Sequence, residues 1–338
     1  MDRRMGAGGR DGTVARMNRR RWLQAAAALG IVAAWPARAA DLAEPAEPGA
    51  FDTLEFDWVD ARRERPVPVR LYLPQGPRRV PLVVFSHGIG GSRRGYSWLG
   101  RHLAAHGIAS LHPQHVGSDR QLWTHGNLLE IAGRVQDALQ EREAIARVHD
   151  LRFALDALLG GELGARVDVR RIVAAGHSYG ANTTLLAAGA RVERAGRPVE
   201  LGEPRLVAAI VISAPPFFGQ GDPRRVLAGV TLPTLHVTAT EDVIRIPGFW
   251  SDAADRLELF EATASARKWL AMYRGGSHSM FTDRATTGGA VLNPQVKAAT
   301  QSLALAFLRS VFDGEDEALA DWPRRHATLL ARFDAVRA

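Results

Sequence analysis

The sequence predicts an α/β fold in which helices cover both faces of a mostly parallel central sheet. Short apolar runs alternate with longer amphipathic stretches along most of the 338 residues, as expected when helices connect parallel strands. The runs are continuous in Val, Ile and Leu, which is typical of strands buried on both faces. Apolar residues make up 46% of the chain, enough for a large core, and no shift in composition marks a second domain. We therefore expect a single folded domain.

Seven apolar runs are the candidates for strands of this sheet. Each is short and is separated from the next by a stretch that can hold a helix or a long loop. Parallel strands present their carboxyl ends at one edge of a sheet, so the loops after these runs are the expected place for a site. In chain order, the runs are Val69 to Leu73, Leu82 to Phe85, Ile108 to Leu111, Arg171 to Ala175, Val207 to Ile212, Thr234 to Val237 and Trp269 to Tyr273.

Two helices are predicted from the spacing of apolar residues. Such residues recur three and four positions apart from Val148 to Leu158, which predicts an amphipathic helix that ends near Gly160. A second helix, roughly Pro294 to Phe312, carries apolar residues along one face. We expect this second helix to close the domain.

The first 39 residues resemble a twin-arginine export signal. Arg19 to Arg21 precede the apolar run Ala25 to Ala34, and Ala37-Arg38-Ala39 follows as a cleavage site of the A-x-A type. An uncleaved membrane anchor is the alternative. The apolar run is shorter than the roughly 18 residues of a membrane span and Pro36 closes it, so we expect cleavage after Ala39 and no stable anchor afterwards.

Charge and domain organisation follow from this signal. Residues 1–39 hold eight Arg against two Asp, so they carry most of the formal net charge of +7 and leave the remainder close to neutral. The nearly neutral remainder of the chain gives no electrostatic reason to expect a nucleic-acid partner. We expect a linker at residues 40–54, a catalytic domain at residues 55–338, and export through the twin-arginine translocase to the periplasm or the medium. The chain has no cysteine, which excludes disulfides and a Cys nucleophile.

The strongest functional signal is Gly176-His177-Ser178-Tyr179-Gly180, which fits the pattern G-x-S-x-G. It directly follows the predicted strand Arg171 to Ala175 and opens a helical pattern, as this motif requires. A Cβ at either glycine would collide with the neighbouring strand or helix, because the serine between them sits in a strained turn. The context predicts Ser178 as a nucleophile on the α/β-hydrolase fold.

A serine nucleophile needs a general base and a carboxylate that orients the base. Glu241 and Asp242 follow the predicted strand that starts at Thr234, and His278 follows the strand that starts at Trp269. The order Ser, acid, His is the order that this fold uses. We prefer Asp242 to Glu241 because apolar residues and a proline come after it, where a returning loop would begin. The predicted triad is Ser178, Asp242 and His278.

A Gly-rich segment, Phe85 to Ser92, is the candidate for an oxyanion hole. It follows an early strand and has the glycine density that lets backbone amides turn toward a ligand. One donor should be the amide of Ile89, and the other the amide of Tyr179, which follows the nucleophile. His87 is expected to brace the loop, since a base should follow the last strands.

With these residues in place, the chain resembles the bacterial branch of the α/β-hydrolases that includes dienelactone-hydrolase-like and platelet-activating-factor-acetylhydrolase-like proteins. The resemblance extends over most of residues 55–312. Dienelactone hydrolases proper use a Cys nucleophile, and acetylhydrolases place their acid where this chain has Ser213 to Pro216, which supports Asp242 here. The resemblance is carried by Phe85 to Gly91, His112-Pro113-Gln114-His115 with Gly117-Ser118-Asp119, Gly176 to Gly180, and His278-Ser279-Met280-Phe281.

These features predict a serine hydrolase that cleaves carboxylic esters without a metal or an organic cofactor. The substrate class is a small-molecule or lipid-like ester, and some of five aromatic residues should line its pocket: Trp123, Phe217, Phe218, Phe249 and Trp250. A serine peptidase or amidase, a non-catalytic binding protein on this fold, and a cofactor-free lyase or haloperoxidase remain as alternatives. A metal cluster of His112, His115, His125 and Asp119 is disfavoured because no fixed metal-binding spacing occurs.

Overall fold

The computed structural model describes residues 49–194, 196–246, 249–283 and 289–337. The predicted export signal and residues 40–48 of the predicted linker lie outside the described residues. The described residues belong to one compact unit. Within the part of the chain that is described, no helix is both long and apolar enough to cross a membrane.

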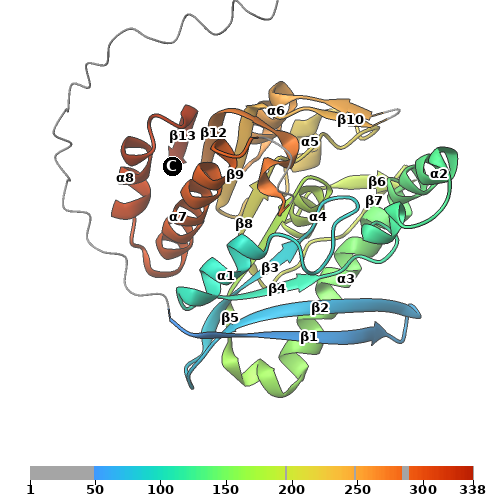
Figure 1. The fold of residues 1–338 in the computed structure, drawn as a ribbon, viewed down its shortest axis with the longest axis horizontal. Coiled ribbons are helices and arrows are strands. Elements are labelled where there is room, and N and C mark those ends of the chain that lie inside the picture. The colour runs from blue at the N-terminus through green and yellow to red at the C-terminus, as the bar shows by residue number, and fades with distance from the viewer. Residues whose placement is uncertain (1–48, 195, 247–248, 284–288, 338) are drawn as a thin grey trace, which may run out of the picture. The chain divides into compact units, whose positions relative to one another are not determined.

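A nine-stranded sheet forms the centre of this unit (Figure 1). Six neighbouring inner strands are parallel, whereas the pair at one edge and the single strand at the other edge are joined by antiparallel pairing. In spatial order, the strands are β1 (Phe51–Asp60), β2 (Arg65–Pro74), β4 (Ala109–Pro113), β3 (Val80–Ser86), β5 (Val167–His177), β8 (Leu206–Ile212), β9 (Thr234–Glu241), β12 (Arg267–Ser277) and β13 (Leu330–Arg337).

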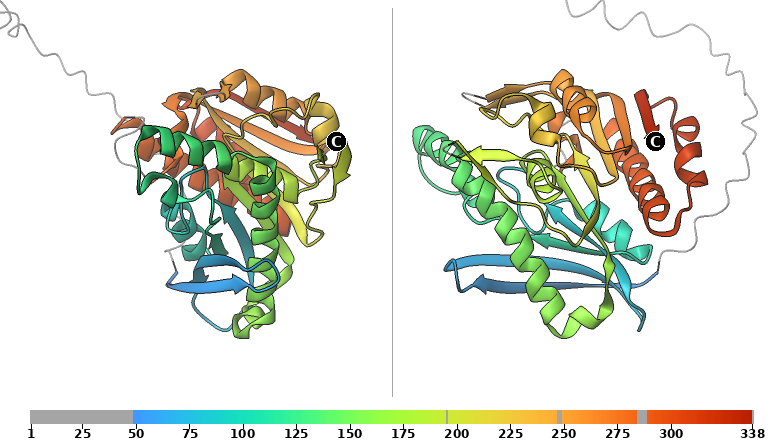
Figure 2. Two further views of the ribbon diagram at one scale, coloured as in Figure 1. Left: turned by 90° about the vertical axis from the view of Figure 1, so that its right-hand side faces the viewer. Right: turned by 180° about the vertical axis from the view of Figure 1, so that it is seen from behind.

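Helices cover both faces of the sheet, so the predicted α/β-hydrolase architecture is confirmed. One face carries α1 (Ser97–Ala105), α7 (Leu292–Asp313) and α8 (Glu317–Arg325), and Figure 1 looks onto this face. The opposite face carries α3 (Glu141–Gly160), α4 (Tyr179–Ala187), α5 (Pro223–Leu227) and α6 (Ala253–Ala262). Figure 2 (right) shows α3 crossing the sheet on that face.

Shorter elements connect the strands and the longer helices. A helix, α2, precedes α3, and two small hairpins follow α4 and β9. These elements and the 3-10 turns are α2 (Leu128–Ala138), β6 (Val192–Arg194), β7 (Arg197–Val199), β10 (Ile244–Ile246), β11 (Phe249–Ser251), η2 (Arg120–Trp123), η3 (Glu162–Arg166) and η4 (His278–Phe281).

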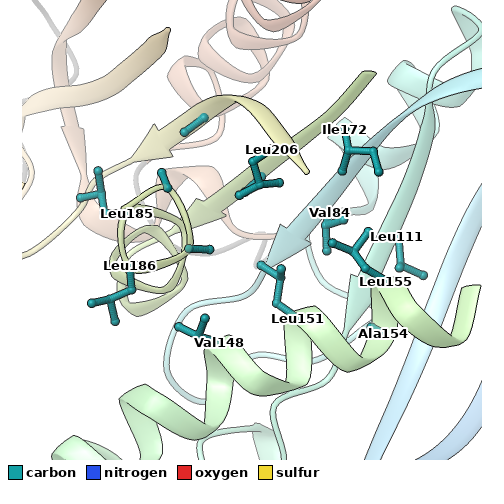
Figure 3. Packing of buried hydrophobic residues seen from close by; sticks show 14 of the residues in the cluster. Val84, Leu111, Val148, Leu151, Ala154, Leu155, Ile172, Leu185, Leu186 and Leu206 are labelled. Carbon is teal, nitrogen blue, oxygen red and sulfur yellow. The ribbon is translucent and has the colours of Figure 1, made fainter. Parts of the chain in front are cut away.

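Two apolar cores lie on opposite sides of the sheet, and Figure 3 shows part of the one under α3. Leu151 and Leu155 of α3 and Leu185 of α4 are fully buried against sheet residues such as Val84 and Ile172. Each buried leucine side chain contributes about 1.5–3 kcal/mol through removal from water. The apolar spacing that predicted α3 is therefore the stripe that holds this helix on the sheet.

All seven predicted strands occur, in β2, β3, β4, β5, β8, β9 and β12, and both predicted helices occur as α3 and α7. The prediction that α7 closes the domain was wrong, because α8 and β13 follow it and β13 pairs with β12 at the sheet edge. β1 begins at Phe51, so the last four residues of the predicted linker 40–54 belong to the sheet. An edge strand with one half-buried side lacks the continuous apolar run that marked the inner strands.

The order of the strands places the site. From β3 the chain passes through α1 to β4 on one side, whereas β5 pairs with β3 on the other side. Ligands of open parallel sheets bind at such a switch point, beyond the carboxyl ends of the strands. The segments after β3 and β5 are those of the predicted oxyanion loop and nucleophile.

Candidate active site

Ser178 lies in a tight turn between β5 and α4. Its backbone has φ 57° and ψ −125°, a conformation that L-residues rarely adopt. Its amide donates to the carbonyl of Ile212 in β8 at 2.9 Å. A Cβ at Gly176 would fall well inside contact distance of the Gly180 carbonyl, and one at Gly180 would do the same to the carbonyl of Ser86. Both glycines are therefore required by close approach of backbone, as the motif predicted.

The structure brings His278 and Asp242 together from the ends of two adjacent strands. His278 opens the turn η4 after β12, and Asp242 follows β9. Nδ1 of His278 lies 2.7 Å from Oδ1 of Asp242. Because a carboxylate only accepts, Nδ1 carries the proton and Nε2 is left as the basic nitrogen. Glu241, the alternative acid, is exposed.

Asp242 is fully buried, and Thr238 and Arg256 contact its carboxylate in addition to His278. Thr238 Oγ1 donates to its Oδ2 at 2.8 Å, and Arg256 Nη2 approaches its Oδ1 at 3.4 Å. Burial raises the pKa of Asp242, but the His278 imidazole and the Arg256 guanidinium outweigh burial and hold this pKa well below its usual range. The carboxylate is ionised at neutral pH, as a partner that orients an imidazole must be.

Ile89 and Tyr179 present backbone amides near the nucleophile. In the turn after β3, Gly90 donates to the Ser118 carbonyl at 2.8 Å and Gly91 to the Gly88 carbonyl at 3.0 Å. The Ile89 amide makes no backbone hydrogen bond to any residue in the described ranges. Tyr179 is the first residue of α4, where an amide has no intrahelical acceptor. Neither amide has a backbone acceptor among the described residues, so both could donate to an oxyanion.

A cavity of about 410 Å³ contains Ser178, His278, Ile89 and Tyr179 in its lining. Its volume is within the range of small-molecule sites. Most of the remaining lining is apolar. It comes from the α2–α3 corner, α4, the segment after β8, and the segment from Val243 through the β10–β11 hairpin: Leu139, Ala144, Ile145, Leu186, Pro215, Pro216, Phe217, Phe218, Val243, Ile244, Ile246 and Phe249. This composition suits an apolar acyl or alcohol group.

Of the five aromatic candidates, Phe217, Phe218 and Phe249 line this cavity and two do not. Trp250 is 59% exposed on β11. Trp123 is 44% exposed, and its indole donates to the Gly90 carbonyl at 3.3 Å. Trp123 therefore packs on the back of the loop that carries Ile89, and its predicted contact with substrate has no support from the geometry.

His87 braces the loop, as its position predicted. Its Nδ1 donates to the Gly88 carbonyl at 2.7 Å, and its Nε2 accepts from the His115 amide at 3.1 Å. Burial lowers the pKa of His87 well below its ordinary value, so the ring is neutral. His115 bonds Asp150 and Ser86, and His112 bonds Ser110, so each has protein partners of its own.

Three other carboxylates in loops of the chain cap the elements that follow them. Asp119, Asp222 and Asp252 each accept a backbone amide at the start of η2, α5 and α6, respectively. Across the described residues, no group of three or more His, Asp or Glu side chains is arranged to hold a metal ion.

Sequence reasoning missed a hydrogen-bond chain that joins the oxyanion loop to the loop of His278. The Gly88 amide donates to Tyr96 Oη at 3.3 Å, and Tyr96 Oη lies 2.8 Å from His177 Nδ1. His177 Nε2 lies 3.0 Å from the carbonyl of His278, so Nε2 donates and Nδ1 accepts. Burial lowers the pKa of His177 to about 3, which keeps it neutral. A polar residue at the end of a buried strand was the available signal.

Fold and site together define a class of hydrolases built on an open parallel sheet with a strained serine turn. A family model described as the alpha/beta hydrolase family matches residues 83–337, and the chain belongs to this family. Family membership indicates a hydrolase. A search of curated proteins finds no match. The narrower resemblance to dienelactone hydrolases and acetylhydrolases stays a prediction.

Proposed function

We propose that the protein is a serine hydrolase of carboxylic esters that works through Ser178, His278 and Asp242. The observation that carries this proposal is the 2.7 Å contact between His278 Nδ1 and the buried Asp242 carboxylate, in a cavity whose lining includes both His278 and Ser178. A strained serine that shares a cavity with an imidazole oriented by a carboxylate supports acyl transfer through this serine.

In the proposed reaction, Ser178 Oγ bonds to the ester carbonyl carbon while His278 Nε2 takes the hydroxyl proton. Asp242 stabilises the resulting imidazolium, and the amides of Ile89 and Tyr179 bind the negative oxygen. The bond from carbon to the leaving oxygen then breaks, and His278 returns its proton to the alcohol. A water molecule attacks the acyl-enzyme in the same way and releases the acid and free Ser178.

The apolar cavity supports small or lipid-like esters as substrates, with an apolar group seated among Phe217, Phe218 and Phe249. A serine peptidase or amidase would use the same three residues and remains the second hypothesis. Turnover of amides without turnover of the matched esters would favour it. Turnover without acid release would favour a lyase or haloperoxidase, and folded protein without any turnover would favour a binding protein.

Export belongs to the proposal as well. The arginines and the A-x-A site of residues 1–39 support passage through the twin-arginine translocase to the periplasm or the medium. Intact-mass analysis of the protein from these fractions should then give a chain that starts at Ala40. A full-length chain found only in the cytoplasm would contradict export.

Labelling of the purified protein with a fluorophosphonate, followed by peptide mapping, tests the nucleophile directly. We expect one adduct per chain on Ser178, together with hydrolysis of p-nitrophenyl esters whose acyl length is varied. The chain-length profile then measures how much of the cavity an acyl group fills. A folded protein that forms no adduct and hydrolyses no ester would overturn the proposed function.

A further inference from the structure

Arg147 is a fully buried arginine beneath the candidate active site. It lies on α3, between Glu143 and Asp150 on the same inward face. Those two carboxylates pair with another residue, Arg65, at 3.0 and 2.9 Å. A buried cation is costly because it leaves water, and its neighbours must compensate for that loss. An apolar residue would pack at this position without the loss of hydration that a buried charge suffers. Packing alone therefore does not explain why Arg147 lies here.

The guanidinium bonds the two segments that supply the predicted oxyanion donors. Its Nη2 donates to the carbonyl of His87, two residues before Ile89. Its Nε donates to Thr183 Oγ1 at 2.9 Å, one turn after Tyr179 in α4. Its carbon Cζ lies 4.5 Å from the centre of the Tyr179 ring, a cation–π contact. One side chain thus holds the Ile89 loop and the start of α4 at the same time.

A third donor secures the same loop from behind. Arg147 Nη1 donates to Ser118 Oγ at 2.8 Å, and the backbone carbonyl of Ser118 accepts the amide of Gly90 at 2.8 Å. The rigid, planar fork of arginine fixes such contacts in direction as well as distance, which lysine cannot do. Both flanks of Ile89 are therefore tied to one buried cation.

We propose that Arg147 is a positioning residue for the oxyanion hole, which sets the relative orientation of the Ile89 and Tyr179 amides and adds positive potential beneath the oxyanion. The inference rests on the proposed function. Donors that are oriented before the reaction stabilise the transition state more than the bound substrate. Loss of Arg147 should therefore lower kcat and leave KM nearly unchanged.

The test compares Arg147→Met and Arg147→Lys with Arg152→Met, a matched control on the same helix. Arg152 bonds the Gly202 carbonyl and approaches Glu203, and it does not line the cavity. Fluorophosphonate titration gives the fraction of active enzyme, so that kcat is measured per active site. Affinity for a trifluoromethyl ketone, which forms an oxyanion on the serine, reports the oxyanion hole separately.

Arg147→Met should lower kcat per active site by about 10²–10³-fold, which is the effect of losing an oxyanion donor. The affinity for the trifluoromethyl ketone should fall by a similar factor. KM should change by less than about threefold, and Arg147→Lys should recover part of the loss because it keeps the charge. The Arg152→Met control should match the wild type. A folded Arg147→Met enzyme with wild-type kcat, or with reduced kcat but unchanged ketone affinity, would overturn the inference.

Thr183→Val tests the same idea if Arg147→Met does not fold. It removes one of the three hydrogen bonds of Arg147 while it keeps the volume of the side chain. We expect a several-fold loss in both kcat and ketone affinity, and unchanged values of both would overturn the inference. A wild-type protein that forms no Ser178 adduct defeats the proposed function, whereas a labelled wild type with unaffected variants defeats only the role of Arg147.

Discussion

The helices that cover the two faces of the sheet differ in what they bury. On one face, the buried residues of α7 are uncharged, and Leu303 and Phe307 are fully buried among them. On the other face, α3 buries Glu143, Arg147 and Asp150 beside its apolar stripe. Both helices are long and pack on parallel strands. The helices therefore differ in buried charge because different loops lie next to them at the edge of the sheet.

The buried charges of α3 lie where this helix passes beneath the candidate oxyanion loop. Asp150 accepts from Arg65 at 2.9 Å and pairs with Nδ1 of His115 at 3.2 Å, and Nε2 of His115 lies 3.1 Å from Ser86 Oγ. Burying ion pairs is a poor way to gain stability, because desolvation offsets the attraction. We infer that the α7 face is built for stability, whereas the α3 face trades stability for a fixed loop geometry.

The largest expected effect is a loss of activity at Ser178 that leaves the stability of the protein almost unchanged. Ser178→Ala should lower kcat/KM for esters by more than about a thousandfold, because it removes the proposed nucleophile. The free energy of unfolding should change by about 1 kcal/mol or less, since only one hydroxyl oxygen is removed. Ester kinetics and urea denaturation of the same preparation measure both. Retention of more than about a thousandth of the activity would remove Ser178 from the mechanism.

The opposite outcome is expected on the α7 face. Phe307→Ala removes a fully buried ring that packs edge-to-face on Trp269 at 5.5 Å, and should lower the free energy of unfolding by about 3–5 kcal/mol. The fraction that remains folded should have wild-type kcat. Phe312→Ala, at a partly buried position on the same helix, is the control and should cost only about 1–2 kcal/mol. A loss of kcat per active site in Phe307→Ala would show that this face is not purely structural.

The same contrast explains how much the sequence alone predicted. The inner strands and the apolar stripes of α3 and α7 follow from local patterns, because continuous apolar runs have few alternatives to burial. The order of the motifs along the chain also predicted Asp242 and His278. In the structure, Nδ1 of His278 lies 2.7 Å from Oδ1 of Asp242. Their separation in the chain did not matter, because parallel strands bring their carboxyl ends to one edge.

Long-range polar contacts were not predictable in this way. Arg147 stands in a charged stretch of α3, where a sequence gives every reason to expect a solvated side chain. Its partners His87 and Thr183 lie 60 and 36 residues away and are ordinary polar groups. The spacing of Glu143, Arg147 and Asp150, four and three residues apart, was the available signal that all three share one helix face. The small hairpin β10–β11 was missed because strands of three residues leave no measurable pattern.

The smallest expected effect concerns pH on the polar side of the sheet. His236 of β9 packs edge-to-face against Phe260 of α6, and its Nε2 has no hydrogen-bond partner among the described residues. Burial lowers the pKa of His236 to about 3, whereas an unfolded histidine titrates near about 6.5. Between these values the unfolded chain binds one proton more than the native protein at this residue. Stability should therefore fall as pH falls below about 6.5, by up to about 1.4 kcal/mol per pH unit for this histidine.

His236→Leu isolates this contribution, because it removes the titrating ring and keeps an apolar side chain against Phe260. Urea denaturation between pH 7.5 and about 4.5 measures how the free energy of unfolding changes with pH. The slope should be shallower in His236→Leu than in the wild type, by up to the roughly 1.4 kcal/mol per pH unit that one proton contributes. His125→Gln is the control, since His125 is exposed, and its slope should equal that of the wild type. An unchanged slope in His236→Leu would mean that the buried ring accepts a proton without unfolding. Burial of polar groups on this face would then lower the free energy of unfolding less than we infer from its comparison with the α7 face.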